Sequence, residues 1–249
     1  MLVFRACATC EKEIEWYEGF STLHSEHTEA EALVDDMVQS IVDKVLNHYK
    51  YEGDYEILMC FSDPKANFRK HLLPTYKANR AGKRKPLGYY EVVKWVHKNF
   101  RTYQKDTLEA DDCVGILMTI KGNNAVAVSG DKDFKSIPGK FYNFLQDEFY
   151  EISKEEADYN HLYQTLIGDT ADNYKGCPGI GSVGAHKILD ESPTWEAVVA
   201  AFEKKGLDEE EALLQARVAR ILRAEDYDFK KKVPKMWTPV CSKTTVTHK

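Results

Sequence analysis

Two aspartates directly follow a short apolar run near the middle of the chain. Residues 125–130 read Ala-Val-Ala-Val-Ser-Gly, and Asp131 and Asp133 come next. A β-branched run that stops at small residues and then acids is typical of a buried parallel strand at its carboxyl edge, where open α/β sheets bind ligands. We therefore expect an α/β fold in which both aspartates face a cleft.

Three further groups of acids can reach the same edge. Asp63 ends an expected strand over residues 55–62, the acids Glu109, Asp111 and Asp112 precede the apolar segment 113–120, and Asp169 and Asp172 follow an expected helix that Gly168 stops. Clustered carboxylates repel one another unless a cation lies among them, and hard oxygen ligands suit Mg²⁺ or Mn²⁺. The pattern predicts a metal-dependent enzyme. Taken singly, acids at a helix start also favour the helix dipole, and Asp is common in turns.

Residues 67–86 interleave cations with aromatic rings. Such a mixture suits single-stranded nucleic acid, because rings stack on bases and cations follow phosphates. The simpler interpretation is a solvated face, and the formal net charge of −6 also counts against nucleic acid unless many acids bind metal. The members are Phe68, Arg69, Lys70, Tyr76, Lys77, Asn79, Arg80, Lys83, Arg84 and Lys85.

A glycine-rich turn lies at residues 176–181, before an expected helix. Gly176, Gly179 and Gly181 predict a tight hairpin whose exposed amides precede a helix capped by Ser182, with Lys187 on that helix. Amides at a helix start can hold a phosphate, although a glycine-rich turn is weak evidence alone. Beyond it we expect a helix with Pro193 at its first position, and a last helix over 210–223.

Length and composition fit a globular protein of one sizeable domain, or of a core domain with a smaller one. The chain has 249 residues, of which 43% are hydrophobic, and six scattered cysteines that we expect to be reduced. It has no apolar segment long enough to cross a bilayer and no signal-peptide pattern at its start, so we expect a cytoplasmic protein without a membrane partner. Residues 241–249 are expected to be a mobile tail.

In this order, the motifs resemble those of the bacteriophage 5′-to-3′ exonucleases of the flap endonuclease superfamily, from about Leu2 to about Lys232. The matching blocks are Phe61–Asp63, the Tyr-Lys-Ala-Asn-Arg block at 76–80, Glu109–Asp112, Ser129–Phe134, Gly168–Asn173 and the hairpin at 179–181. The resemblance implies a central, mostly parallel sheet flanked by helices, the PIN-like 5′ nuclease fold, in a nuclease domain over 1–172. It also implies a basic arch around 68–100 and a C-terminal helical region over 173–240 with a helix-hairpin-helix element.

The resemblance further implies a 5′-to-3′ exonuclease or flap endonuclease that hydrolyses DNA with two Mg²⁺ ions, for which Mn²⁺ can substitute. One ion would lie near Asp63, Glu109, Asp111 and Asp112, and the other near Asp131, Asp133, Asp169 and Asp172. Lys77 and Arg80 would clamp the phosphate, Tyr76 would stack on a base, and Lys83, Arg84 and Lys85 would steer the strand. Arg69, Gly176, Gly179, Gly181, Ser182 and Lys187 complete the expected DNA contacts, with a monovalent cation at hairpin 176–182. We expect a monomer that acts on duplex DNA with a 5′ end, flap or branch.

The sequence departs from the family pattern at its start. In the family, a strand carrying an aspartate precedes the segment that matches Leu2–Ala6, and this sequence begins after it. We therefore expect a missing interior strand and a missing metal ligand, and lower stability and activity than in a chain extended by about fifteen to twenty residues. Two alternatives follow: a catalytically impaired, structure-specific DNA-binding protein, or a metal-dependent RNase, which would leave the glycine-rich hairpin without a role.

Overall fold

The computed structural model describes residues 1–239. Its helices are α1 (Leu2–Cys10), α2 (His27–Tyr49), α3 (Arg69–Leu72), α4 (Tyr89–Asn99), α5 (Ala110–Lys121), α6 (Lys154–Ile167), α7 (Ser182–Glu191), α8 (Trp195–Glu203) and α9 (Glu209–Ala219), with 3₁₀ turns η1 (Ala78–Arg80), η2 (Gly122–Asn124), η3 (Lys132–Ser136) and η4 (Ala224–Asp226). The strands are β1 (Lys12–Tyr17), β2 (Phe20–His24), β3 (Leu58–Phe61), β4 (Arg101–Gln104), β5 (Val126–Ser129), β6 (Gly139–Asn143), β7 (Glu148–Ile152), β8 (Tyr227–Asp228) and β9 (Val233–Pro234).

The strands expected in a central sheet form two short sheets. β3 pairs in parallel with β4, whereas β5 pairs in parallel with β6, which pairs antiparallel with β7. Within residues 1–239, no strand pairs with the second edge of β3 or of β5. Helix α5 contacts both sheets. The predicted α/β class and the mostly parallel pairing are confirmed, and in the described residues the sheet is divided into these two short pieces.

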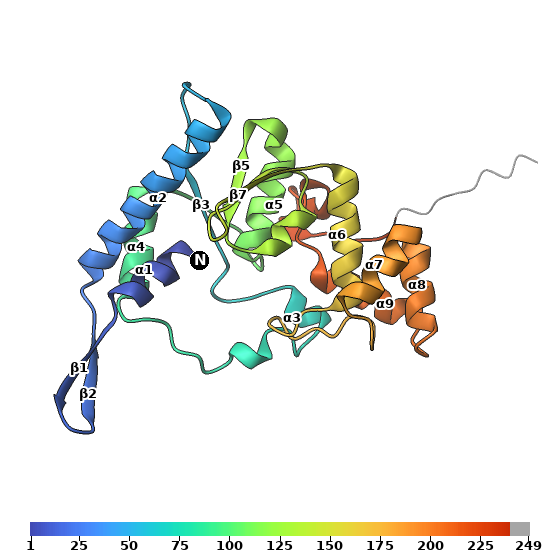
Figure 1. Ribbon diagram of the computed structural model, residues 1–249, viewed down its shortest axis with the longest axis horizontal. Coiled ribbons are helices and arrows are strands. Elements are labelled where there is room, and N and C mark those ends of the chain that lie inside the picture. Colours follow the sequence, from blue (N-terminus) through green and yellow to red (C-terminus); the bar gives the residue numbers. More distant parts are fainter. Residues whose placement is uncertain (240–249) are drawn as a thin grey trace, which may run out of the picture.

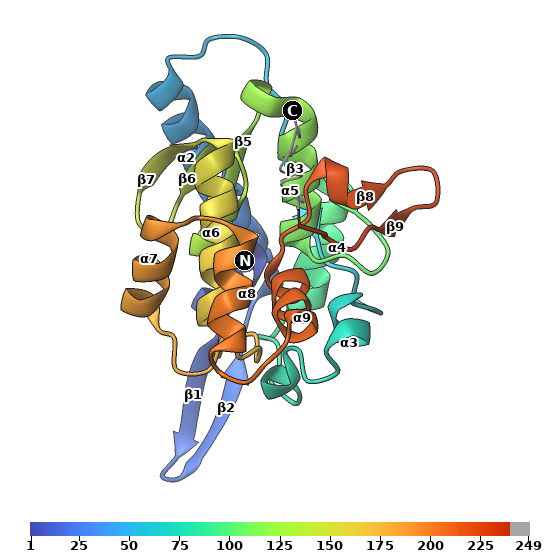
Figure 2. The same cartoon turned by 90° about the vertical axis from the view of Figure 1, so that its right-hand side faces the viewer.

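Apolar faces divide the helices into two main groups. Helices α1, α2 and α4 share a core around Val34, Val92 and Val96, and α6 to α9 share another around Leu166, Leu189 and Phe202. Figure 1 shows these groups on opposite sides of α5 and the β5–β7 sheet, and Figure 2 shows α6 to α9 packed together. Because α6 lies in the second core, that core begins before residue 173, where we placed the domain boundary; the boundary itself stays a prediction.

Local signals placed several helices correctly. Ser153 and Glu156 form the expected capping box: the Ser153 Oγ accepts the Glu156 N–H at 3.1 Å, and the Glu156 Oε2 accepts the Ser153 N–H at 2.8 Å. Gly168, with φ of +68°, ends α6 as expected. Two expected helix starts are wrong. Gly181, not Ser182, is the N-cap of α7, and α8 begins at Trp195 after the Thr194 cap, leaving Pro193 outside.

The sequence did not indicate the hairpin formed by β1 and β2. It projects from the α1 and α2 side of the molecule (Figure 1), and every residue of both strands is exposed. No helix in the described residues is long and apolar enough to span a membrane. The expected tail at 241–249 lies outside the described residues.

Candidate active site

Lys77 lies between two acids from distant parts of the chain. Its ammonium contacts Glu109 at the start of α5 and lies 3.3 Å from the Asp172 Oδ2 in the loop after α6. The Lys77 N–H donates to the Asp172 carbonyl at 2.8 Å, and Lys77 adopts a left-handed φ of 56°. Left-handed backbone is uncommon outside glycine, so tertiary contacts must hold Lys77 there. The structure thus brings three predicted site residues together.

The loop after α6 is also fastened to η1. Arg80 forms an ion pair with Asp172, and the Asn79 side chain donates to the carbonyls of Thr170 and Ala171 at 3.0 and 3.2 Å. Asp169 shapes this loop because its carboxylate accepts the Ala171 N–H at 2.6 Å. Lys77 and Arg80 therefore converge on Asp172, in the loop that Asp169 shapes.

Further carboxylates gather at the carboxyl end of β5. Burial and the neighbouring charges of Glu109 and Asp131 raise the pKa of Asp111 to about 7. Burial and Asp131 likewise raise the pKa of Asp133 to about 6, although Asp133 accepts a hydrogen bond from the Gln164 side chain at 2.6 Å. Burial is the larger cause of both raised pKa values, and repulsion between the neighbouring carboxylates adds to it.

The pKa of Glu109 is lowered, whereas the pKa of Asp111 is raised. Burial would raise the Glu109 pKa, but the charges of Arg69 and Lys77 outweigh that effect and lower the pKa to about 2. The Tyr76 hydroxyl lies 2.8 Å from the Glu109 Oε2 and 3.0 Å from the Asp172 Oδ2. Glu109 therefore stays ionised and held in place on one side of the site.

Asp63 joins the site through the backbone that precedes Glu109. Its N–H donates to the Leu108 carbonyl at 2.8 Å, and its carboxylate accepts the N–H groups of Thr107 and Lys65 at 2.7 and 2.8 Å. These hydrogen bonds lower the Asp63 pKa. Asp63 thus lies where β3 ends, as expected, beside the start of α5.

Asp112 and Arg69 form a buried ion pair, which contradicts both predicted roles. The guanidinium nitrogens of Arg69 lie 2.7 Å from each Asp112 oxygen, and the two side chains are 3% and 0% exposed. Arg69 also donates to the carbonyls of Val218 and Arg220. We had placed Asp112 with the metal ligands and Arg69 with the DNA contacts, but both side chains are enclosed and their hydrogen bonds are internal.

Two other predicted DNA contacts disagree with the structure. Tyr76 is 3% exposed, so its ring is not available to stack on a base. The Gly176 N–H donates to the Gln215 side chain at 3.0 Å inside the protein and cannot reach a phosphate. Arg84 pairs with the Glu11 carboxylate at 2.6 and 2.7 Å but its side chain is exposed, so its DNA contact stays a prediction. These residues were singled out by type and position, which do not reveal burial or partners.

The remainder of the glycine-rich hairpin is open to solvent. Gly179, Gly181 and Ser182 are exposed around the start of α7, and Lys187 is exposed further along that helix. The Ser182 hydroxyl accepts a hydrogen bond from Tyr163 at 2.8 Å rather than capping the helix. This surface keeps free amides at a helix start, as phosphate binding requires.

The carboxylate oxygens of this site are donors that suit a hard divalent cation, although they are not arranged around a common point. Within residues 1–239, no three His, Cys, Asp or Glu side chains lie close enough together to hold a metal ion. Burial and mutual repulsion raise the pKa values of Asp111 and Asp133, and a bound cation would offset both effects. Residues that could hold it are Glu109, Asp111, Asp131, Asp133, Asp169 and Asp172, with Asp63 adjoining.

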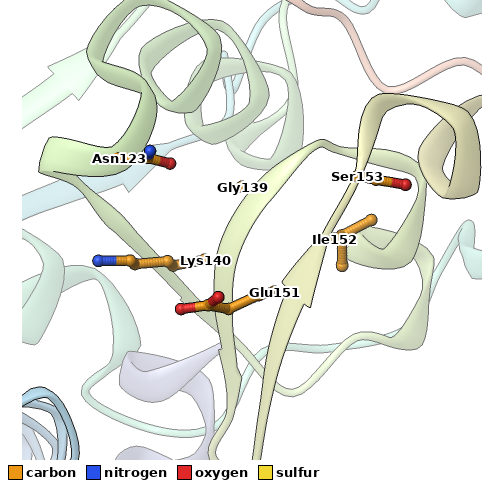
Figure 3. A pocket seen from close by; sticks show the side chains of 6 residues that line it. All are labelled: Asn123, Gly139, Lys140, Glu151, Ile152 and Ser153. Carbon is orange, nitrogen blue, oxygen red and sulfur yellow. The ribbon is translucent and has the colours of Figure 1, made fainter.

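A cavity of about 440 Å³ lies elsewhere (Figure 3). It is lined by Asn123, Gly139, Lys140, Glu151, Ile152 and Ser153, at the amino ends of β5 and β6. The acids lie at the opposite ends of these strands. This cavity is therefore separate from the acidic site.

Comparison with known proteins identifies the family. Residues 13–162 match the model of the 5′-3′ exonuclease N-terminal resolvase-like domain. The chain belongs to the 5′-3′ exonuclease family. The exodeoxyribonuclease of Enterobacteria phage T3 is 30% identical over 96% of this chain and 90% of its own length. The exonuclease of Escherichia phage T7 is 28% identical, with 96% and 91% covered.

Solved structures support the fold. The T5 5′-exonuclease with bound zinc matches with a TM-score of 0.60 and 17% identity, covering 74% of this chain and 80% of that one. A T5 flap endonuclease in complex with DNA and metal ions matches with a TM-score of 0.62 and 16% identity, covering 77% and 80%. These structures confirm the predicted fold, and the family match with the phage relatives confirms the predicted 5′-3′ exonuclease class. Divalent-metal dependence is general in this family.

Gln164 and the hydroxyl of Tyr76 are site groups that sequence reasoning missed. Gln164 donates to Asp133 from the middle of α6, and Tyr76 joins Glu109 to Asp172. Gln164 looked like an ordinary polar helix residue. The position of Tyr76 beside Lys77 did indicate a place in the site. Its aromatic ring next to cations, however, favoured the prediction that it stacks on a base.

Proposed function

We propose that this chain hydrolyses DNA phosphodiester bonds at or near 5′ ends, with two Mg²⁺ ions held by the acidic site. The observation that carries the proposal is the convergence of Lys77 and Arg80 on acids from two separate segments: Glu109 at the start of α5 and Asp172 in the loop after α6. The two cations would bind the phosphate anion, and the neighbouring carboxylates would bind the metal ions. Mn²⁺ could substitute, because it prefers the same oxygen donors.

The chain's own residues would act in three ways. When bound, the metal ions would activate a water molecule and neutralise charge on the phosphate. Lys77 and Arg80 would hold the phosphate, Arg80 through a planar guanidinium that can engage two oxygens. Since both cations now pair with Asp172, phosphate binding would exchange one anion for another at the same place.

Exposed groups would guide the rest of the substrate. Lys83 is solvent-exposed between η1 and α4, and the hairpin around Gly179 and Gly181 offers amides to the duplex backbone. We propose that the protein acts as a monomer in the cytoplasm, on DNA with a 5′ end, flap or branch. A monovalent cation at hairpin 176–182 stays a prediction.

A matched set of substrates and ions tests this function. A 5′-labelled duplex and a 5′-flap substrate would be incubated with Mg²⁺, Mn²⁺, Ca²⁺ or EDTA, alongside the same strand as RNA. We expect release of 5′ products with Mg²⁺ and Mn²⁺, and none with EDTA. An Asp133→Asn variant should lose turnover but keep DNA binding, whereas Asp106→Asn, an exposed acid before α5, should keep both.

The alternative is a DNA-binding protein without cleavage. One observation favours this alternative: within residues 1–239, no three acidic side chains lie close enough together to hold a metal ion. Binding of flap DNA in Ca²⁺ without any product in Mg²⁺ or Mn²⁺ would support this alternative and overturn the nuclease proposal. Faster cleavage of RNA than of DNA would indicate an RNase instead.

A further inference from the structure

The segment between η1 and α4 is fastened at both ends. Residues 81–87 form no helix or strand and are mostly exposed. Figure 1 shows this part of the chain crossing from the side of α3 to that of α1 and α4. At its first end, Asn79 and Arg80 are bonded to the loop that carries Asp172. At its second end, Glu11 holds it.

Glu11 receives three hydrogen bonds from this segment. Its two oxygens accept Arg84 Nη2 and Nη1 at 2.6 and 2.7 Å, and one of them also accepts the Leu87 N–H at 2.9 Å. Bidentate pairing of this kind is the strongest and most directional arrangement of an arginine and a carboxylate. The hydrogen bonds from Arg84 and Leu87 lower the Glu11 pKa to about 2, so the carboxylate stays charged at neutral pH.

Glu11 is held in place because it follows helix α1, which is packed in the core. It directly follows α1, and its side chain is only 14% exposed. Cys7 and Cys10 fix α1 within the core that α1 shares with α2 and α4. The anchor therefore belongs to the packed body, while Arg84 belongs to the exposed segment.

The three neighbouring cations of the segment are unequal. Arg84 is paired with Glu11, and the Lys85 ammonium lies over the rings of Phe4 and Tyr89, 5.6 and 5.1 Å from their centroids. For Lys83, no hydrogen bond or ion pair of the side chain is found among residues 1–239. Of this basic triplet, Lys83 is therefore the most available to a phosphate.

We propose that Glu11 is a positioning residue for DNA cleavage, which holds residues 81–87 in place through Arg84 and withholds Arg84 from the DNA backbone. The inference rests on the proposed function. Glu11 would keep Lys77 and Arg80, at the start of the segment, aligned with the acids. It would also reserve phosphate contact for Lys83.

A Glu11→Gln variant tests the proposal, with Glu18→Gln as a control that loses the same charge at the exposed turn of the β1–β2 hairpin. DNA binding in Ca²⁺ would be measured over a range of salt concentrations. Freeing Arg84 adds about one phosphate contact, so the slope of log Kd against log salt should steepen by about 0.9 in Glu11→Gln. Glu18→Gln should leave the slope unchanged. An unchanged slope in both variants would overturn the proposal.

Two further measurements separate positioning from folding and from the nuclease function. Trypsin should cleave Glu11→Gln within residues 83–85 at least threefold faster than the native chain at an unchanged melting midpoint, even if no nuclease activity exists. In Mg²⁺, kcat should fall at least threefold without a rise in KM. The charge exchange Glu11→Arg with Arg84→Glu, which also removes a trypsin site, should recover kcat. Equal cleavage by trypsin, or no recovery in the exchanged pair, would count against Glu11 as the anchor.

Discussion

Asp112 and Arg69 face each other in an enclosed ion pair, each carboxylate oxygen 2.7 Å from a guanidinium nitrogen. The Asp112 Oδ2 also accepts the Glu109 N–H at 3.0 Å, and its Oδ1 accepts the Leu222 N–H at 3.1 Å. The pair therefore joins α3, the start of α5 and the C-terminal segment. Among the acids at 109–112, this one stabilises the fold rather than the site.

Removal of Asp112 should destabilise the protein strongly. Asp112→Asn leaves the 3%-exposed Arg69 charge without its main partner, and breaking a buried pair in this way costs about 3–5 kcal/mol. Urea denaturation would measure the loss. The control is Arg101→Gln, which breaks an ion pair with Glu56 whose side chains are 72% and 56% exposed and should cost under about 1 kcal/mol. Equal losses in both variants would contradict this assignment.

Lys77 should matter for turnover far more than for stability. Lys77→Met removes the ammonium that lies between Glu109 and Asp172, and loss of one such charge-stabilising group lowers kcat about 10²–10³-fold. Single-turnover cleavage in Mg²⁺ would measure it. Lys83→Met, in the exposed segment, should change KM only a few-fold. A Lys77 variant with native kcat would exclude the residue from the reaction.

Asp111 should make the metal-free protein less stable as the pH rises. Its folded pKa is about 7 against an unfolded value of 3.8, so the folded state binds more protons between these values. Stability therefore falls from about pH 4 to about pH 7, by at most about 4 kcal/mol from this group. In EDTA, Asp111→Asn should raise the melting midpoint at pH 8 but not at pH 4. A gain that does not depend on pH would refute this cause.

His161 should make the protein less stable as the pH falls, which is the opposite of the effect of Asp111. It is buried beside the Ala216 carbonyl, 2.9 Å from its Nε2, and burial followed by the charge of Arg220 lowers the His161 pKa to about 3. The unfolded state therefore takes up a proton first, and stability falls as the pH drops from about 6.5 towards 3. In His161→Gln this part of the acid sensitivity should disappear from urea titrations between pH 7 and 4, whereas in His71→Gln, at an exposed position, it should remain.

The two glycines Gly176 and Gly181 should differ sharply when changed to alanine. Gly176 has φ of +61°, and a Cβ there would overlap the backbone of Leu166, Ile167 and Gly168. Gly181 has φ of −98°, and a Cβ there would meet nothing within 4 Å. Gly176→Ala should therefore cost about 3 kcal/mol or more, and Gly181→Ala under about 1 kcal/mol, in thermal unfolding. Similar melting midpoints would show that the close approach of Gly168 and Gly176 is not a constraint.

Features that depend on nearby residues were predictable from the sequence. The Ser153 capping box and Gly168 set the bounds of α6, and the strand that ends at Ser129 delivers Asp131 and Asp133 as expected. The positions of Lys77 and Arg80 near the acids followed from the family resemblance. Each of these features rests on a local pattern or a family motif.

Features that depend on distant partners were not predictable. Arg69 carries the same charge as Arg80, and its burial is set by Val218 and Arg220, about 150 positions away. Asp112 differs from Asp111 by one step along a helix, which turns one carboxylate inward and the other towards Asp131. The β1–β2 hairpin lacks a buried face, so its strands show no apolar alternation facing a core.

The division of the sheet has a consequence for how substitutions far from the site would act. β3 and β5 are not joined by backbone pairing in the described residues, and both rest on α5. Asp63 and Asp131, which follow these two strands, are thus positioned relative to each other by side chains of α5 rather than by a ladder of backbone hydrogen bonds. Cys113 and Ile116 of α5 pack with β3, and Met118 packs with β5. A substitution that changes the shape of this apolar layer would tilt the β3–β4 sheet against the β5–β7 sheet. Such a change would lower the rate of catalysis while every acid is still present.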